Sequence, residues 1–130
     1  MGLRDFFTNR AETSDTHPNQ ALQTRYYKTT GQQAMKFLRD VIEQDPRLRL
    51  LSYSEEHAEI TAEYIKPKKA FVVVSVIMVF PYRTAVDLTI STQTVWPTDF
   101  GFSRKQVQFF YRKLDERFEF AGTGLGEKKS

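Results

Sequence analysis

The 130-residue sequence has no cysteine, which excludes disulfide bonds, thiolate nucleophiles and cysteine-based zinc sites. Its two histidines, His17 and His57, lie far apart in polar segments, so neither a zinc site nor a histidine base paired with a nucleophile is in view. No apolar run approaches the roughly 20 residues that cross a bilayer, and the first residues lack the apolar run of a signal peptide. We therefore expect a cytoplasmic, non-catalytic protein with no transmembrane segment, no metal and no cofactor.

The composition is that of one ordinary soluble domain. Hydrophobic residues make up 40% of the chain and charged residues 27%, and a chain of this length buries about two-thirds of its unfolded surface. The 19 Lys and Arg against 16 Asp and Glu give a net charge of +3, which allows an acidic partner without requiring one. Polar, aperiodic ends divide the chain into a flexible arm (1–20), a single α+β domain (21–120) and a flexible tail (121–130).

One stretch, residues 71–80, organises the rest of the chain. It is dominated by β-branched and aromatic residues and ends at Pro81, which favours a strand in the middle of a sheet over a helix. Both faces of this strand are apolar, so both need an apolar cover. The set that we assign to an exposed sheet face or subunit interface is Val72, Val74, Val76, Met78 and Phe80. Self-association of two copies is the cover that we expect.

The remaining elements follow from alternation, helical spacing and capping residues. Alternating side chains predict four further strands, at 22–28, 48–53, 58–65 and 84–95. A first helix starts at Thr30, whose spacing to Gln33 is that of a capping box, and stops at Asp45. A second helix has Ser103 as its N-cap and carries an apolar stripe that ends at Phe118.

The order strand, helix, four strands, helix predicts a two-layer α+β domain, with one five-stranded antiparallel sheet and both helices on one face. Short turns join the last four strands into a meander. Strand one is expected beside strand five, which gives the order 1-5-4-3-2. This connectivity resembles one half of the TATA-binding-protein fold and the related helix-grip folds. The resemblance is topological and implies no function.

Residues 99–104, just before the second helix, carry a sharper resemblance. The segment reads DFGFSR, which is similar to the Asp-x-Gly-x-Asn/Ser-Arg signature of an uncharacterised family of small bacterial proteins. Asn19 follows a proline where that family has a Pro-Asn step, and Gln20 stands where it usually has a cysteine. The resemblance implies no known activity. From the residues themselves, we expect Asp99 to accept hydrogen bonds at the helix N-terminus and Gly101 to adopt a backbone angle that other residues avoid.

A basic end of the sheet is the candidate ligand site. In an antiparallel meander, the turn 66–69 and the N-terminus of the second helix lie at the same end of the sheet, about 10 Å apart. Free N–H groups and the helix dipole there would suit a phosphate or a carboxylate. The residues assigned to this anion site are Lys66, Lys68, Lys69, Ser103, Arg104 and Lys105. The alternative is that the long side chains point into water or pair with Asp99.

These features favour a non-catalytic binding or scaffold domain, expected to be a homodimer, that holds a protein or a small ligand. The alternative is an electrostatic binder of nucleic acid or anionic membrane, which would add Arg112 and Lys113 to the basic end. Nucleic-acid binding across the sheet is disfavoured because Glu59, Glu63 and Asp87 flank the central strand. An enzyme has the least support, since nothing supplies a positioned nucleophile or base.

Overall fold

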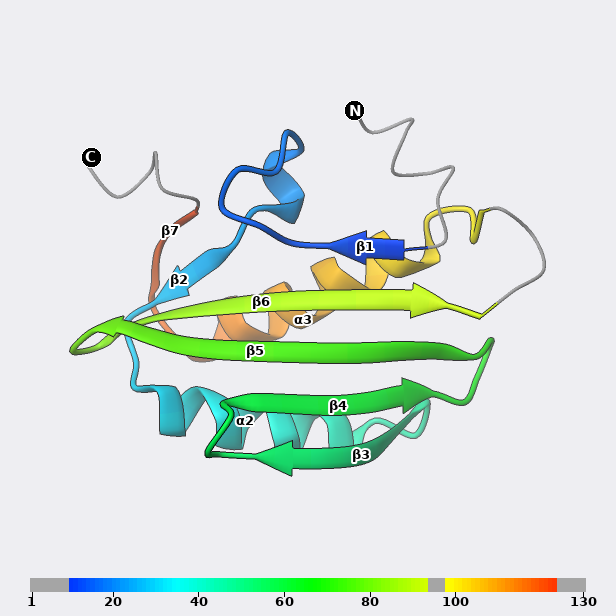
Figure 1. The fold of residues 1–130 in the computed structure, drawn as a ribbon, viewed down its shortest axis with the longest axis horizontal. Coiled ribbons are helices and arrows are strands. Elements are labelled where there is room, and N and C mark those ends of the chain that lie inside the picture. The colour runs from blue at the N-terminus through cyan, green and yellow to red at the C-terminus, as the bar shows by residue number, and fades with distance from the viewer. Residues whose placement is uncertain (1–9, 94–97, 124–130) are drawn as a thin grey trace.

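Two α-helices lie on one face of a seven-stranded antiparallel sheet (Figure 1). The computed structural model describes residues 10–93 and 98–123. The elements in chain order are β1 (Arg10–Glu12), the 3₁₀ turn η1 (Gln20–Leu22), β2 (Arg25–Tyr27), α2 (Gly31–Gln44), β3 (Leu48–Ser54), β4 (Glu59–Tyr64), β5 (Ala70–Phe80), β6 (Arg83–Thr92), α3 (Phe102–Arg117) and β7 (Phe120–Thr123). The fold is therefore an α+β domain built on an antiparallel sheet.

The sheet has more strands than the sequence predicts. Its order is β3-β4-β5-β6-β2-β7, and β1 also pairs with β6, so the expectation of a five-stranded sheet is wrong. The path from β3 to β2 runs through the five predicted strands in the expected order, and β1 and β7 are additions to it. β1 lies within the predicted flexible arm, and most of β7 lies within the predicted tail. The remainder of that arm and tail, 1–9 and 124–130, lies outside the described residues.

β6 is long enough to hold two strands along one edge. β1 pairs with its last residues, around Ile90, and β2 pairs with its first residues, around Ala85. Between these pairings, residues 13–24 leave the sheet and return. The Thr13 N–H donates to the Leu88 carbonyl at 2.9 Å, so the segment stays attached to β6 where it departs.

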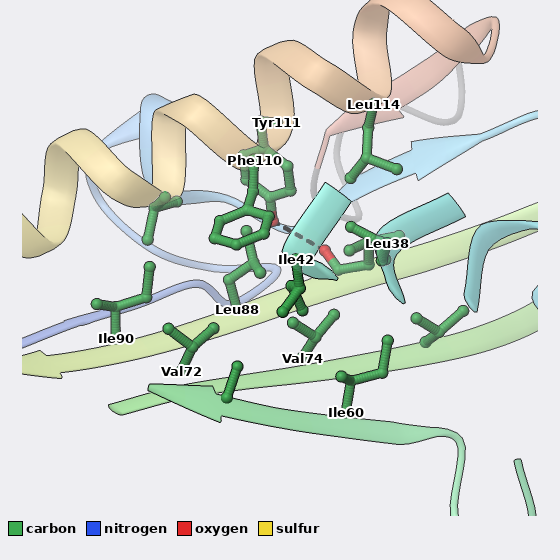
Figure 2. Close-up of a cluster of buried hydrophobic side chains, with 14 of the residues drawn as sticks. Leu38, Ile42, Ile60, Val72, Val74, Leu88, Ile90, Phe110, Tyr111 and Leu114 are labelled. Carbon is green, nitrogen blue, oxygen red and sulfur yellow. Dashed lines mark hydrogen bonds between the residues drawn. The ribbon is translucent and has the colours of Figure 1, made fainter. Parts of the chain in front are cut away.

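The helices cover the face of the sheet that carries the even-numbered side chains of β5. The side-chain oxygen of Thr30 accepts the N–H of Gln33 at 3.2 Å, which confirms the predicted N-cap of α2. In α3 the Tyr111 hydroxyl donates to the Val86 carbonyl at 2.8 Å and ties the helix to the sheet. Figure 2 shows the core between the two layers, which includes Leu38, Ile42, Ile60, Val72, Val74, Leu88, Ile90, Phe110 and Leu114.

β5 is longer than its neighbour β4. β4 pairs with it from Ala70 to Ser75, whereas β6 pairs with it as far as Phe80. The hairpin of β5 and β6 therefore projects past the end of β4, at the left of Figure 1. At its tip, Tyr82 has a left-handed backbone with φ of 59°. The two halves of one apolar strand thus have different surroundings.

Candidate binding surfaces

The carboxylate of Asp99 organises the start of α3. It accepts the N–H groups of Gly101 and Ser103, each at 3.1 Å, together with the hydroxyls of Ser103 at 2.5 Å and Thr92 at 2.6 Å. Asp99 is only 3% exposed, and Gly101 is the N-cap with a left-handed φ of 87°. The expected roles of Asp99 and Gly101 are therefore confirmed. The N-cap is not Ser103, because the helix already begins at Phe102.

The β4–β5 turn and the start of α3 lie close together, as the predicted basic end requires. The backbone N–H groups of Gly101 and Ser103, however, already donate to Asp99. The Lys68 ammonium lies 5.3 Å from the ring centre of Phe102, which places the β4–β5 turn beside the first turn of α3. Lys66, Lys69 and Lys105 are exposed. The N–H and hydroxyl of Ser103, however, both donate to Asp99. An internal carboxylate thus occupies the position that an external phosphate would need, and the anion site stays a prediction.

The apolar face assigned to an interface lies mainly inside the molecule. Val72, Val74 and Val76 are at most 2% exposed and pack beneath the helices, so they form core and not an open face. Only Met78, at 49% exposed, and Phe80, at 60%, reach the surface, because they lie past the end of β4. Both faces of the strand are apolar in the sequence, and alternation alone does not tell which face the helices cover.

The face of the sheet opposite the helices is mixed rather than apolar. Phe71 and Val73 of β5 are flanked by polar side chains of the neighbouring strands, including Thr61 of β4. Glu63 is buried by Arg49 of β3, whose Nε donates to the Glu63 carboxylate at 2.8 Å. Beside β4, this side of the sheet is therefore mixed, and its most exposed apolar side chain in β5, Ile77 at 58%, lies past the end of β4.

A groove of about 540 Å³ lies between the C-terminal part of α2 and the C-terminal half of α3. We call it the helix groove. Its apolar lining is Phe37, Val41 and Phe109, each partly buried, and its charged lining is Asp45, Lys113, Glu116 and Arg117. The floor is anchored to the core, because the Phe37 ring meets Phe118 edge to face at 5.5 Å and the Phe109 ring meets Phe110 at 5.6 Å. The groove is thus a firm apolar surface with charges at its rim.

Arg47 fixes the charges at one end of the helix groove. Its guanidinium bonds to Asp45 at 2.8 Å and to the side-chain oxygen of Gln106 at 3.3 Å, and it lies 5.0 Å from the Phe109 ring centre. The hydrogen bond from Arg47 lowers the pKa of Asp45, so this carboxyl stays ionised and paired. Burial raises the pKa of Tyr64, whose protonated hydroxyl donates to Gln106 at 3.0 Å. The negative charge of Asp45 is therefore compensated within the domain.

Asp87 holds the excursion of residues 13–24 against β6. Its Oδ1 accepts the hydroxyls of Thr13 at 2.7 Å and Thr24 at 2.5 Å. Burial is the main cause that raises the pKa of Asp87, and the two hydroxyl bonds oppose that rise. Nearby, the Tyr26 hydroxyl donates to Asp15 at 2.8 Å, and burial raises the pKa of Tyr26 to about 12. These groups tie chain segments together.

Sequence reasoning missed the helix groove, although one signal pointed to it. Phe109, Phe110 and Tyr111 are consecutive, and three neighbouring aromatics span more of a helix circumference than one buried stripe covers. Phe110 and Tyr111 face the core, so Phe109 is left on the flank. Phe37 and Val41 have the spacing of the apolar stripe of α2, but they lie at the edge of the core. The neighbouring helix covers them only in part, so both stay partly exposed.

Within residues 10–93 and 98–123, no group of three or more histidine, aspartate or glutamate side chains could hold a metal ion. No helix in this part of the chain is long and apolar enough to cross a membrane. Comparisons with protein-family models, with curated proteins and with solved structures find no match. The resemblance to the bacterial family therefore stays a prediction.

Proposed function

We propose that this chain is a non-catalytic protein-binding domain whose helix groove holds an acidic, amphipathic helix of a partner protein. The observation that carries the proposal is the combination of an aromatic floor with a rim of two cations and two carboxylates, one of which, Asp45, is paired with Arg47. A groove between two helices accepts the side-chain ridge of a third helix, and amphipathic helices dock in this way through apolar residues one turn apart.

The apolar part of the groove sets the kind of partner. Phe37, Val41 and Phe109 come from both helices and form one strip between them. The groove is open to solvent rather than enclosed, which suits a helical segment better than a compact small molecule. A partner helix would cover the strip with leucine-like residues at positions i, i+3, i+4 and i+7.

The charged part of the groove determines the sign of the charge that we expect on the partner. Lys113 and Arg117 stand one turn apart on α3, so both can meet acidic residues that are one turn apart on a partner helix. Asp45 is paired with Arg47 and opposes such a partner less than a free carboxylate would. The net charge of the chain, +3, acts in the same direction.

Binding of two designed peptides tests this proposal. The probe is a dye-labelled helical peptide of about 18 residues with leucines at the spacing above and glutamates beside them, and its match has lysines in place of the glutamates. Fluorescence anisotropy should show binding of the acidic peptide only. Val41→Glu, and separately the double variant Lys113→Glu with Arg117→Glu, should raise its Kd at least tenfold.

Lys105→Glu is the matched control, because it reverses one charge on the same helix outside the groove. It should change the Kd less than twofold. Equal binding of both peptides, or equal loss in the control, would overturn the proposal. Binding that disappears between low and physiological salt and persists in Val41→Glu would instead support the electrostatic alternative, which a labelled oligonucleotide would then test directly.

A further inference from the structure

The second half of β5 has one free edge. The last bond between β5 and the segment before β4 joins the Val76 N–H to the Ala58 carbonyl at 3.0 Å, and β5 continues to Phe80 beside β6 alone. N–H groups of a strand alternate in direction, so the N–H of Met78 points to the same side as that of Val76. Among the described residues, no backbone partner is bonded to Met78 on that side.

This edge lacks the charge and the proline that usually discourage strand pairing. Residues 76–80 read VIMVF, and the interruption within them is a bulge at Val79, where the register of β5 with β6 shifts by one residue. Large side chains around the edge are exposed, with Ile77 at 58% and Tyr82 at 67%. An uncharged edge and an apolar surface thus coincide.

The exposed area is sufficient for an interface between two molecules. Five half-exposed side chains of this size contribute roughly 500 Å² per molecule, since a large aromatic alone buries about 150–250 Å². Two copies would then bury at most about 1,000 Å² in side chains, which reaches the lower limit for a specific interface, and paired backbone adds to this. The five side chains are Ile77, Met78, Val79, Phe80 and Tyr82.

A notch of about 310 Å³ lies next to the free edge. It is lined by Gly31, Met35, Glu55, Ala58, Val76 and Met78, among others. In antiparallel pairing around Met78, Val79 of the second strand lies opposite Ile77. The next position along the edge, beside Val76, is held by Ala58, so the paired backbone spans residues 77–79. The second strand would turn at Phe80, next to the notch that Ala58 lines.

We propose that the free edge of β5 pairs antiparallel with the same edge of a second copy. The two sheets then join into one continuous sheet around a two-fold axis near Met78. Such an interface is isologous, since each copy supplies both the hairpin tip and the notch. It does not depend on the helix groove, which uses the other end of α2.

The mass of the full-length protein in solution tests the proposal. Sedimentation velocity across a concentration range should show a dimer for the parent chain. Ile77→Lys and Val79→Lys put a charge in the edge and should each raise the dissociation constant at least tenfold. Leu51→Lys is the matched control, because Leu51 lies in β3 and is similarly exposed, at 48%. It should remain a dimer, and circular dichroism should show all variants folded.

A cysteine scan tests the register of the pairing. The chain has no native cysteine, so any disulfide must involve the introduced residue. Antiparallel pairing around a two-fold axis places one residue opposite its own copy. Met78→Cys should therefore form a disulfide-linked dimer at least tenfold faster under mild oxidation than Ile77→Cys or Val79→Cys. Equal rates at all three positions would overturn the pairing around Met78.

Other outcomes overturn the proposal as a whole. A parent chain that stays monomeric at every concentration would do so, and so would a dimer that survives both edge variants, since its interface would then lie elsewhere. Vesicles of anionic phospholipid decide what a monomer would mean. If a monomeric parent binds them and Ile77→Lys abolishes that binding, the exposed tip contacts membrane and not a second copy.

Discussion

The two ends of the β5–β6 ladder are built from similar residues and have opposite environments. At one end Ala70 and Thr92 are buried, and the Thr92 hydroxyl bonds to Asp99 before α3. At the other end Phe80 and Tyr82 are largely exposed, with no strand beyond β5 on the side of β4 in the described chain. We call these the closed end and the open end.

The difference shows that burial along this strand depends on its neighbours and not on its composition. Three consecutive valines begin at Val72, and more apolar residues follow as far as Phe80. β4 and the two helices surround the first part, whereas β6 is the one described strand that pairs with the last part. An apolar segment that the fold leaves exposed is more informative about binding than one that the fold buries.

The largest expected effect comes from placing the same charge in each half of β5. Val74→Asp should lower the free energy of unfolding by more than about 4 kcal/mol, because it leaves an unpaired charge in the core. Ile77→Asp should lower it by less than about 1 kcal/mol, because Ile77 already faces water. Urea unfolding followed by circular dichroism, in protein dilute enough to be monomeric, measures both. Similar losses in the two variants would erase the distinction between the ends.

A second prediction concerns the carboxylate that completes the closed end. Asp99→Ala should lower the free energy of unfolding by about 2–4 kcal/mol, because it removes a helix cap and leaves buried donors of Thr92 and Ser103 without their acceptor. Asp99→Asn retains one oxygen acceptor and should lose less. An alanine variant as stable as the parent would mean that other groups hold the start of α3.

The strands that the sequence predicts are those in which polar and apolar side chains alternate over many residues. β4 and β6 alternate over their whole length, and short turns join them to β5, so their neighbours follow from chain connectivity. β1 and β7 have three and four residues, too few for an alternating pattern to stand out. They are strands because β6 and β2 offer backbone partners from distant parts of the chain, and no local pattern records that.

The candidate surfaces were predictable only in part. The capping residues of the DFGFSR segment identify Asp99 and Gly101 as structural, because their chemistry acts over a few residues. The covered face of β5 and the length by which it exceeds β4 depend on how helices and strands pack in three dimensions. The helix groove likewise exists only once α2 and α3 lie side by side.

The open end should tolerate change, and one substitution should even stabilise it. Tyr82 has a left-handed φ of 59°, a conformation that disfavours side chains with a Cβ. Tyr82→Gly should therefore raise the free energy of unfolding by about 0.5 kcal/mol, the relief of strain minus the added flexibility of the unfolded chain. Tyr82→Ala is the control, since it removes the ring and keeps the strain. Destabilisation by glycine and not by alanine would contradict this account.

The smallest expected effect concerns Asp87, which lies across the sheet from the first residue of β4, where the open end begins. Asp87 pairs with Ser75, and Ser75 pairs with Glu59, the first residue of β4. Burial raises the pKa of Asp87, so the folded state holds its proton more tightly than the unfolded state does. The stability that this proton contributes is fully present below the ordinary pKa of aspartic acid. It is lost as the pH rises through the raised pKa.

Asp87→Asn isolates the contribution of Asp87 protonation to stability, because the amide oxygen still accepts hydroxyl bonds but does not ionise. The stability of the parent relative to this variant, from urea unfolding between acidic and neutral pH, should fall as the pH rises. Thr24→Val removes one hydroxyl that lowers the pKa, so the fall should become larger. If the parent instead gains stability over Asp87→Asn as the pH rises, the hydroxyls of Thr13 and Thr24 stabilise the ionised carboxylate more than burial opposes it. The boundary between the two ends would then be held by charge-assisted hydrogen bonds, with burial the weaker influence.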